Sequence, residues 1–206
     1  RRSVGPFDNN LYVLSTPGST DAIVVDPCGD DGTVLDELRR RGLTVRRILL
    51  THAHIDHILA VKAYRAATGA PVWLHPGDRW WVERAPAQAM AFQLPWNGGF
   101  EVDHWMADGE DVGLPGIEAR AIETPGHSPG SMTFVTSEGL IVGDVLFAGS
   151  VGRTDLPLCD PEALVRSVRE RLFAYPDATP VHPGHGPATT VRAERRSKPF
   201  DGDPAR

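Results

Sequence analysis

Short apolar runs alternate with turns rich in glycine and proline along most of the chain. Such runs are typical of β-strands, which we predict at 11–14, 22–25, 46–50, 71–74, 117–124, 131–136, 140–142 and around Val181. Apolar residues at helical spacing predict helices capped by Asp31, over 58–68, and from Pro161 to Leu172. Because strands and helices alternate in the first half of the chain, we predict an α/β layered domain.

The segment 76–105 breaks this regular order. It holds four of the five tryptophans, and prolines and a Gly-Gly pair interrupt its periodicity. We predict a broken helical insertion there, whose tryptophans pack helices onto the sheet, with a lid over a site as the alternative. The polar segment 192–206 is expected to fray at the end of the chain. Residues 1–206 are thus expected to form a single domain with this insertion and this tail.

Composition places the chain among globular proteins. Of its 206 residues, 41% are apolar and 23% are charged, and 27 acidic against 21 basic side chains give a net charge of −6. The acidic balance argues against a nucleic-acid partner, and no apolar run reaches the roughly 18 residues needed to cross a membrane. Without a signal-peptide pattern, we expect a cytoplasmic protein, monomeric or weakly self-associating. The two cysteines, Cys28 and Cys159, are expected to be chemically inert.

The strongest chemical signal is a run of potential metal ligands directly after the predicted strand 46–50. In the pattern H-x-H-x-D-H, four such side chains fall within six residues: His52, His54, Asp56 and His57. A loop at the carboxyl end of a strand can bring all four to one point, and active sites of open α/β sheets gather at that end. Imidazole and carboxylate groups suit zinc, iron or manganese.

Three more residues follow predicted strands in glycine- or proline-rich loops. His127 lies in Thr-Pro-Gly-His-Ser, Asp144 in Val-Gly-Asp, and His185 in His-Pro-Gly-His-Gly. Glycine allows the backbone to approach closely and proline stiffens it, and both help to fix a ligand in place. Each residue alone would be a weak signal. After the H-x-H-x-D-H motif, all three become candidate partners in the same metal site.

Together these motifs resemble those of the metallo-β-lactamase fold superfamily, in which H-x-H-x-D-H precedes separate His, Asp and His residues. The resemblance covers nearly the whole chain and is nearest to the small bacterial glyoxalase II-like (hydroxyacylglutathione) hydrolases. Further similar segments lie at 152–155, 183–187, 194–196 and 199–200. The resemblance implies a four-layer αββα sandwich with metals at one edge of its two sheets.

The resemblance also implies a ligand set and an activity. His52, His54 and His127 would hold one metal, Asp56, His57 and His185 a second, and Asp144 would bridge the two. His75, His104 and His182 are left as structural or surface residues. Two divalent ions, zinc before iron or manganese, would supply a hydroxide that attacks a thioester such as S-lactoylglutathione. Asp56 would be the catalytic residue that orients this nucleophile.

The substrate is expected to be a small anionic thioester, because two dications and two carboxylates leave a net positive pocket. Arg153 is the candidate for binding a substrate carboxylate, and an ion pair with Asp155 is the equal alternative. Asp26 is a candidate for the carboxylate that orients the first metal-binding loop. The alternative is that Asp26 only caps a local turn. The chain ends soon after His185, where glyoxalase II proper carries a further helical domain, so the thiol remains open.

Other activities share this fold and stay open at this point. A persulfide dioxygenase would hold one iron through His52, His127 and Asp144. A lactonase or another ester hydrolase would use all seven ligands. A β-lactamase is a weaker match, because its major classes replace or lack the bridging aspartate. A metal-stabilised binding module is the alternative that is not an enzyme, and it would need a closed coordination shell.

Overall fold

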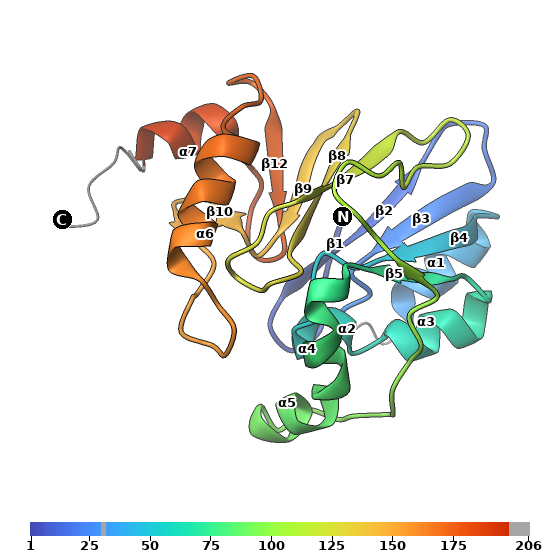
Figure 1. Ribbon diagram of the computed structural model, residues 1–206. Helices are drawn as coiled ribbons and strands as arrows, with labels where there is room; N and C mark the ends of the chain where they lie inside the picture. Colours follow the sequence, from blue (N-terminus) through green and yellow to red (C-terminus); the bar gives the residue numbers. More distant parts are fainter. Residues whose placement is uncertain (30–31, 198–206) are drawn as a thin grey trace.

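Two β-sheets lie face to face in the computed structural model, which describes residues 1–29 and 32–197 (Figure 1). The first sheet has the order β1-β2-β3-β4-β5-β6, with β3 to β6 parallel and β1 and β2 antiparallel to their neighbours. Its strands are β1 (Arg2–Val4), β2 (Asn9–Ser15), β3 (Asp21–Val25), β4 (Thr44–Leu49), β5 (Val72–Leu74) and β6 (His104–Trp105).

The second sheet has the order β13-β12-β9-β8-β7. Its strands are β7 (Ala119–Glu123), β8 (Met132–Thr136), β9 (Gly139–Gly143), β12 (Pro180–Pro183) and β13 (Thr189–Thr190). Strand β9 is antiparallel to β8 and parallel to β12, and β8 is antiparallel to β7. Strands β7, β9 and β12 therefore run in the same direction and end at the same edge. A small hairpin of β10 (Leu146–Phe147) and β11 (Ser150–Val151) follows β9.

The alternation of side chains along the strands explains why both faces of each sheet are covered. In β3, Ile23 and Val25 belong to the core between the sheets, whereas Val24 belongs to the core beneath the helices. In β9, Ile141 faces the core between the sheets, whereas its neighbours Leu140 and Val142 face the other side. Since successive side chains of a strand point to opposite faces, a strand that is apolar throughout must be buried on both.

Helices cover the outer face of the first sheet: α1 (Thr33–Arg40), α2 (Ile55–Ile58), α3 (Val61–Thr68), the short η1 (Pro76–Asp78), α4 (Arg79–Glu83) and α5 (Ala85–Ala91). The outer face of the second sheet is covered by α6 (Pro161–Arg166), its π-helical continuation η2 (Ser167–Leu172) and α7 (Val191–Ser197). Figure 1 shows these orange and red helices on the side away from α1 and α3. The order helices, sheet, sheet, helices confirms the predicted αββα sandwich.

The eight predicted strands are present, but three helical predictions need correction. The helix expected at 58–68 already begins at Ile55 and is broken after Ile58, so part of the H-x-H-x-D-H motif is helical. The insertion is helical only up to Ala91, because 104–105 pairs with β5 as an edge strand. The tail does not fray from residue 192, since α7 buries Val191 and Glu194. The expected cap Asp31 and residues 198–206 lie outside the described residues.

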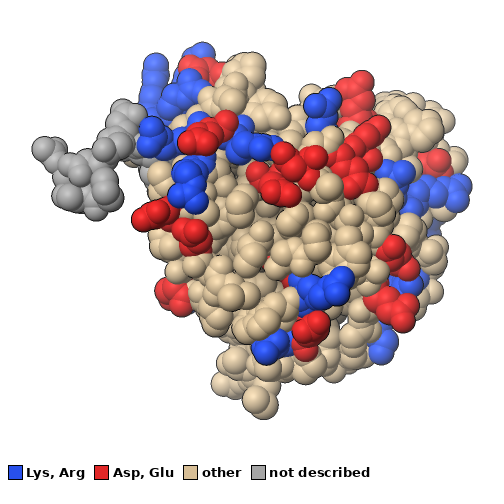
Figure 2. All heavy atoms as spheres, viewed as in Figure 1, with Lys and Arg blue, Asp and Glu red and all other residues tan. Residues whose placement is uncertain are grey.

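Two further observations concern the length of the helices relative to a membrane and the charge on the surface. No helix among the described residues is long and apolar enough to cross a membrane. On the face shown in Figure 2, acidic and basic side chains are interspersed around a broad uncharged area. Charges of both signs are thus mixed on this face.

Candidate metal centre

The seven predicted ligands come together where four segments leave the two sheets. The segment after β4 carries His52 and His54 and leads into α2. His127 follows β7, Asp144 follows β9 and His185 follows β12. Because β7, β9 and β12 run in the same direction, their carboxyl ends meet at one edge of the second sheet. The topology therefore explains why residues more than a hundred positions apart share one site.

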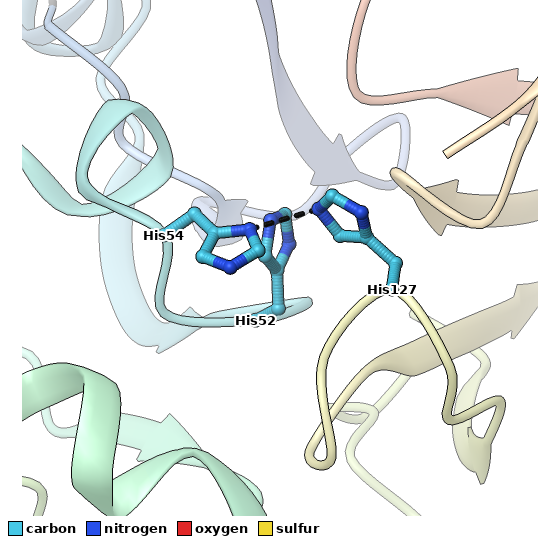
Figure 3. Close-up of side chains that lie close together, drawn as sticks. All are labelled: His52, His54 and His127. Atoms are coloured by element: carbon cyan, nitrogen blue, oxygen red, sulfur yellow. Dashed lines mark hydrogen bonds between the residues drawn. The ribbon is translucent and has the colours of Figure 1, made fainter. Parts of the chain in front are cut away.

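Three of these side chains form what we call the three-histidine cluster: His52, His54 and His127. One ring nitrogen of each lies within 4.8 Å of the others, and all three side chains are buried. Figure 3 shows the rings facing one another, with His54 Nδ1 2.8 Å from His127 Nε2. This cluster contains no carboxylate.

The other four form what we call the carboxylate cluster: Asp56, His57, Asp144 and His185. Their ligand atoms also lie within 4.8 Å of one another. His185 Nε2 is 3.1 Å from Asp56 Oδ2, and His57 Nε2 is 3.3 Å from Asp144 Oδ1. The two clusters adjoin, because His127 Nε2 is 3.7 Å from Asp144 Oδ2.

Hydrogen bonds fix the direction in which most of the histidine rings point. The Nδ1 atoms of His57, His127 and His185 each donate to an oxygen, of the Asp26 carboxylate, the Arg153 carbonyl and the Phe7 carbonyl respectively. His52 Nδ1 lies 3.0 Å from Thr51 Oγ1, whose hydroxyl donates to Asp26 and can therefore accept from the ring. In all four rings Nε2 is left for the cluster, which is how supporting contacts orient metal-binding histidines.

Several buried polar atoms of the site have no hydrogen-bond partner among the described residues. They are His52 Nε2, His54 Nε2, His57 Nε2 and Asp144 Oδ1. His57 Nε2 and Asp144 Oδ1 face each other at 3.3 Å, whereas His52 Nε2 and His54 Nε2 have no neighbour of this kind. Because buried polar atoms almost always have a partner, these atoms on ligand side chains indicate a missing one. Imidazole and carboxylate donors suit divalent zinc, iron or manganese. The residues present thus fit divalent metal ions.

The pKa values of the histidines differ between the two clusters. Burial lowers the pKa of His52 well below its usual value and, with the neighbouring His127, lowers that of His54 to about 3. Burial would also lower the pKa of His185, but hydrogen bonds to Asp144 and Asp56 outweigh it and raise that pKa to about 10. Burial also acts to lower the pKa of His57, but Asp144 and Asp56 outweigh burial and raise that pKa. His52 and His54 are therefore neutral, while the carboxylate cluster holds opposite charges.

The two carboxylates respond in the complementary direction. Burial acts to raise the pKa of Asp56, but the charge of His57 and the hydrogen bond from His185 lower it to about 2. For Asp144, His57 and His185 likewise overcome burial and hold the pKa well below its ordinary value. Both carboxylates are thus ionised, which is the form that binds metal.

Asp26 lies beneath the first ligand loop, with its backbone in the left-handed region at φ 48°. Its carboxylate accepts hydrogen bonds from the backbone N–H and hydroxyl of Thr51, both at 2.7 Å, and contacts His57 Nδ1 at 3.0 Å. Because Thr51 is 25 residues away in sequence, these bonds are not those of a local turn cap. The carboxylate instead joins the end of β3 to the ligand loop.

Arg153 lies at the rim of the site with its guanidinium already paired. Its Nε and Nη2 atoms donate to the two carboxylate oxygens of Asp155 at 2.7 and 2.8 Å, and this bond lowers the pKa of Asp155 to about 2. The part of Arg153 that contacts the cluster is its backbone carbonyl, which accepts from His127 Nδ1. The ion pair foreseen as the alternative reading is therefore present.

Sequence reasoning missed Asp78, a buried residue at the end of η1. It accepts hydrogen bonds from Ala53 N at 2.8 Å, Ser128 Oγ at 2.9 Å and Gly130 N at 2.7 Å. One carboxylate thereby ties the loop of His54 to the loop of His127. In the sequence Asp78 has only the pattern of an ordinary helix start, since its partners lie 25 to 52 residues away.

Asn9 and Gln88 were missed as well. Asn9 Nδ2 donates to Asp56 Oδ2 at 2.9 Å and lies 3.1 Å from His185 Nε2. Gln88 accepts from Ile55 N at 3.0 Å and donates to the carbonyl of Trp81 at 2.9 Å, which attaches α5 to the ligand loop. The only sequence signal for Asn9 was a polar residue at the start of an otherwise apolar strand.

A glycine beside Asp144 shows how tightly the site is built. A Cβ placed on Gly184 would lie 2.2 Å from Asp144 Oδ1 and 2.7 Å from His57 Cε1. Any larger residue there would displace two members of the carboxylate cluster. Gly184 is therefore required because Asp144 and His57 lie close to its backbone, and not only because the chain turns there.

The remaining histidines and both cysteines lie outside the two clusters, although Cys159 Sγ donates to the backbone carbonyl of His127 at 2.9 Å. His75 contacts Glu123, His104 contacts Glu110, and His182 contacts the carbonyl of Glu138. Cys28 is fully buried, and burial raises the pKa of its thiol well above the usual value. A protonated, buried thiol is a poor nucleophile and a poor ligand.

A cavity of about 900 Å³ opens over the two clusters. His54, Asp56, His127, Asp144 and His185 all reach it, and most of its other wall is apolar, including Phe7, Ile55, Trp80, Trp81, Phe92 and Phe147. The ring of Trp81 lies 4.5 Å from that of His54 between centroids. Two tryptophans of the insertion thus line the cavity in addition to packing on the core, so the two readings of the insertion both hold in part.

Comparisons with known proteins agree with this architecture. The probable metallo-hydrolase YqgX of Bacillus subtilis is 35% identical over 207 residues, which cover 97% of this chain and 95% of that protein. The hydroxyacylglutathione hydrolase GloC of Haemophilus influenzae is 36% identical over 183 residues, covering 87% of this chain and 86% of that protein.

Two solved structures resemble the whole fold. BLEG-1, a B3 metallo-β-lactamase, has a TM-score of 0.89 at 36% identity, with 98% of each chain covered. TTHA1623 in a di-iron-bound form has a TM-score of 0.86 at 38% identity, covering 96% of this chain and 98% of that one. The family model described as the metallo-beta-lactamase superfamily matches residues 4–192. The chain therefore belongs to the metallo-β-lactamase superfamily and is a metallo-hydrolase of that fold.

Proposed function

We propose that this protein hydrolyses thioesters of small hydroxy acids, with S-lactoylglutathione as the model substrate. The observation that carries the proposal is the pair of adjoining clusters, joined at His127 and Asp144, on the floor of an open cavity. The similarity to the hydroxyacylglutathione hydrolase GloC over 87% of this chain supports the thioester as substrate.

The ligand assignment follows the two clusters. His52, His54 and His127 would hold one metal ion, and Asp56, His57 and His185 would hold a second. Asp144 lies between them, 3.7 Å from His127 and 3.3 Å from His57, and would bridge both ions. We propose zinc as the resident metal, with iron or manganese suited to the same donors. Divalent ions in such a pair supply an activated water and polarise a carbonyl oxygen.

The chain's own residues would position the reacting groups. Asn9 and His185 both contact Asp56 Oδ2, so Oδ1 is the oxygen that can accept a proton from the attacking water. The hydrogen bond from His57 to Asp26 keeps the His57 ring turned toward the cluster. The apolar walls of the cavity exclude water around the thioester and strengthen the electrostatic interactions on its floor.

The test combines metal analysis with a substrate panel. Protein purified without added metal is analysed for zinc, iron and manganese, and is then assayed with S-lactoylglutathione, a lactone, a nitrocefin-type lactam and glutathione persulfide. We expect about two metal equivalents and a preference for the thioester. Lactone or lactam hydrolysis without thioester hydrolysis would contradict the proposed substrate. Oxygen uptake with the persulfide and one iron per chain would instead identify a dioxygenase.

A further inference from the structure

A single cationic side chain on the cavity wall lacks an acidic partner within the described part of the chain. It is Arg84, which lies between α4 and α5 and lines the cavity. Its guanidinium carbon lies 4.1 Å from the centroid of the Trp80 ring. Guanidinium groups commonly stack on aromatic faces in this way, and the stack holds the plane of the group while its N–H edge stays available.

The other cation of the cavity is engaged elsewhere. Both carboxylate oxygens of Asp155 accept hydrogen bonds from Arg153, so the Nε–Nη2 edge of its guanidinium is already engaged. A substrate carboxylate would have to displace Asp155 to bind that edge of Arg153, whereas at Arg84 it would displace only water. Arg84 is therefore a better placed partner for a substrate carboxylate than Arg153, the candidate that the sequence offered.

Arg84 is separated from the ligands by two indole rings in edge-to-face contact. The Trp81 ring lies 4.5 Å from His54, the Trp80 ring lies 4.8 Å from Trp81, and Arg84 stacks on Trp80. A group bound at Arg84 is thus two indole rings away from the three-histidine cluster. It cannot belong to the reacting carbonyl, and it fits a carboxylate on the far part of the thiol.

Apolar residues of the same cavity are suited to an uncharged stretch of substrate. Phe7 and Phe92, in edge-to-face contact at 6.1 Å, line the same cavity and are each more than 40% exposed. Apolar surroundings weaken the screening of charges by water, which strengthens a guanidinium–carboxylate bond. The cavity thus has three parts: the clusters, an apolar wall and an isolated cation.

We propose that Arg84, held flat on Trp80, is a specificity-determining residue that binds a carboxylate on the thiol half of the substrate. This inference rests on the proposed thioesterase function and deepens it, since it assigns the recognition of the leaving thiol to the tryptophan-rich insertion. It makes the enzyme selective for thioesters of acidic, peptide-like thiols over those of neutral thiols.

The binding experiment uses a thioether, so that it does not depend on turnover. Dissociation constants of S-hexylglutathione and of its diethyl ester are measured by calorimetry for the parent protein and for Arg84→Met. We expect the parent to prefer the free acid, and Arg84→Met to weaken its binding about 10- to 100-fold, as for loss of one charged hydrogen-bonding pair. Binding of the diethyl ester should be the same in both proteins.

Arg79→Met is the matched control. Arg79 also stacks on a tryptophan, 4.7 Å from the centroid of Trp105, and begins the same helix α4, but it does not line the cavity. This variant should bind both ligands as the parent does. Equal binding of acid and ester by the parent, or undiminished acid binding by Arg84→Met, would overturn the inference.

Kinetics separate this inference from the proposed function. With S-lactoylglutathione, Arg84→Met should raise KM by a similar factor and leave kcat within about twofold, because a distant carboxylate contact acts alike on ground and transition states. If the protein binds S-hexylglutathione through Arg84 but hydrolyses no thioester, the proposed function fails and the inference stands. If it hydrolyses thioesters with an unchanged KM in Arg84→Met, the inference fails alone.

Discussion

The three-histidine cluster and the carboxylate cluster are neighbours, but they are stabilised by different forces. In the first, burial lowers the pKa values of His52 and His54, so the imidazoles are neutral and ready to bind metal. In the second, Asp56 and Asp144 raise the pKa values of His57 and His185, so protons hold the cluster together by charge pairing. Metal binding must displace protons in the second cluster and not in the first.

Each cluster also has its own supporting aspartate. Asp78 bonds to the backbone beside His54 and beside His127, and it makes no contact with a ligand side chain. Asp26 contacts a ligand ring directly, at His57 Nδ1. The first cluster is therefore held in place through its loops, and the second through its side chains. One site can thus combine a cluster whose geometry is fixed by its loops with a cluster that is held together by paired charges.

Asp144→Ala should have the largest effect, because this carboxylate belongs to one cluster and borders the other. Its removal takes away the acidic contact of His127 that the described residues provide, and leaves His57 with Asp56 and Asp26. We expect thioester hydrolysis to fall on the order of 10³-fold and bound metal to fall by about one equivalent. Asp36→Ala, on an exposed helix, is the control. Full activity with two metals bound would exclude a bridging role.

Gly184→Ala tests whether the carboxylate cluster can be disturbed alone. The new Cβ would lie 2.2 Å from Asp144 Oδ1, and so must push the carboxylate away from His57. We expect a loss of activity on the order of 10²-fold while the three-histidine cluster still binds one metal. Gly99→Ala is the matched control, since a Cβ there meets nothing within 4 Å. Loss of both metals in Gly184→Ala would show that the clusters are not separable.

Asp78→Asn and Asp26→Asn should weaken opposite halves of the site. An amide at position 78 turns an N–H₂ group toward Ala53 N or Gly130 N, and at position 26 it loses one of the acceptors for Thr51 and His57. We expect each to reduce the metal affinity of its own cluster about 10- to 100-fold. Nitrogen-15 NMR of the histidine side chains during a zinc titration reports which rings bind.

Asp26 also touches Thr51, whose hydroxyl contacts His52, so Asp26→Asn should reach the three-histidine cluster weakly. Asp78→Asn has no such route to His57 or His185. Equal weakening of both clusters by Asp78→Asn would show that the loops, not the individual ligands, are the unit that binds metal.

The sequence indicated which side chains come together, because the seven candidate ligands share a local signal. Each of the seven follows an apolar strand, and the carboxyl ends of parallel strands meet at one edge. The sandwich was predictable for the same reason, since strands such as 22–25 and 140–142 are apolar at every position and need cover on both faces. Burial of alternate residues in different cores bears this out in β3 and β9.

The supporting residues could not be predicted, because their partners are distant in sequence. Nothing near Asp78 indicates that it bonds to Ala53 and Gly130, and Asn9 meets His185 only after β2 is placed in the first sheet. The tail was misjudged in the same way: α7 is mostly polar, but Val191 packs into the core of the second sheet and Glu194 accepts from Gly149 N. Tertiary contacts override local composition in each case.

The smallest effect we predict is on the pH dependence of stability after chelation. His54 has a pKa of about 3 in the folded protein, below the roughly 6.5 of an unfolded histidine. Between these values the unfolded chain binds the extra proton, so stability falls as the pH drops below 6.5. His185 has a raised pKa of about 10, so its stabilising effect is complete below pH 6.5 and is lost as the pH rises toward 10.

The chelated protein should therefore be most stable near pH 6.5, with the two clusters limiting stability on opposite sides. Thermal unfolding of the chelated protein from pH 4 to pH 10 measures this directly. His54→Ala should reduce the slope on the acid side, to which His52 also contributes, and leave the alkaline side unchanged. His185→Ala should reduce the slope on the alkaline side, to which His57 also contributes, and leave the acid side unchanged. In the zinc-loaded protein the alkaline loss should vanish, because metal replaces the proton on His185. The same alkaline slope with and without zinc would mean that His185 binds no metal, and the comparison between the clusters would no longer hold.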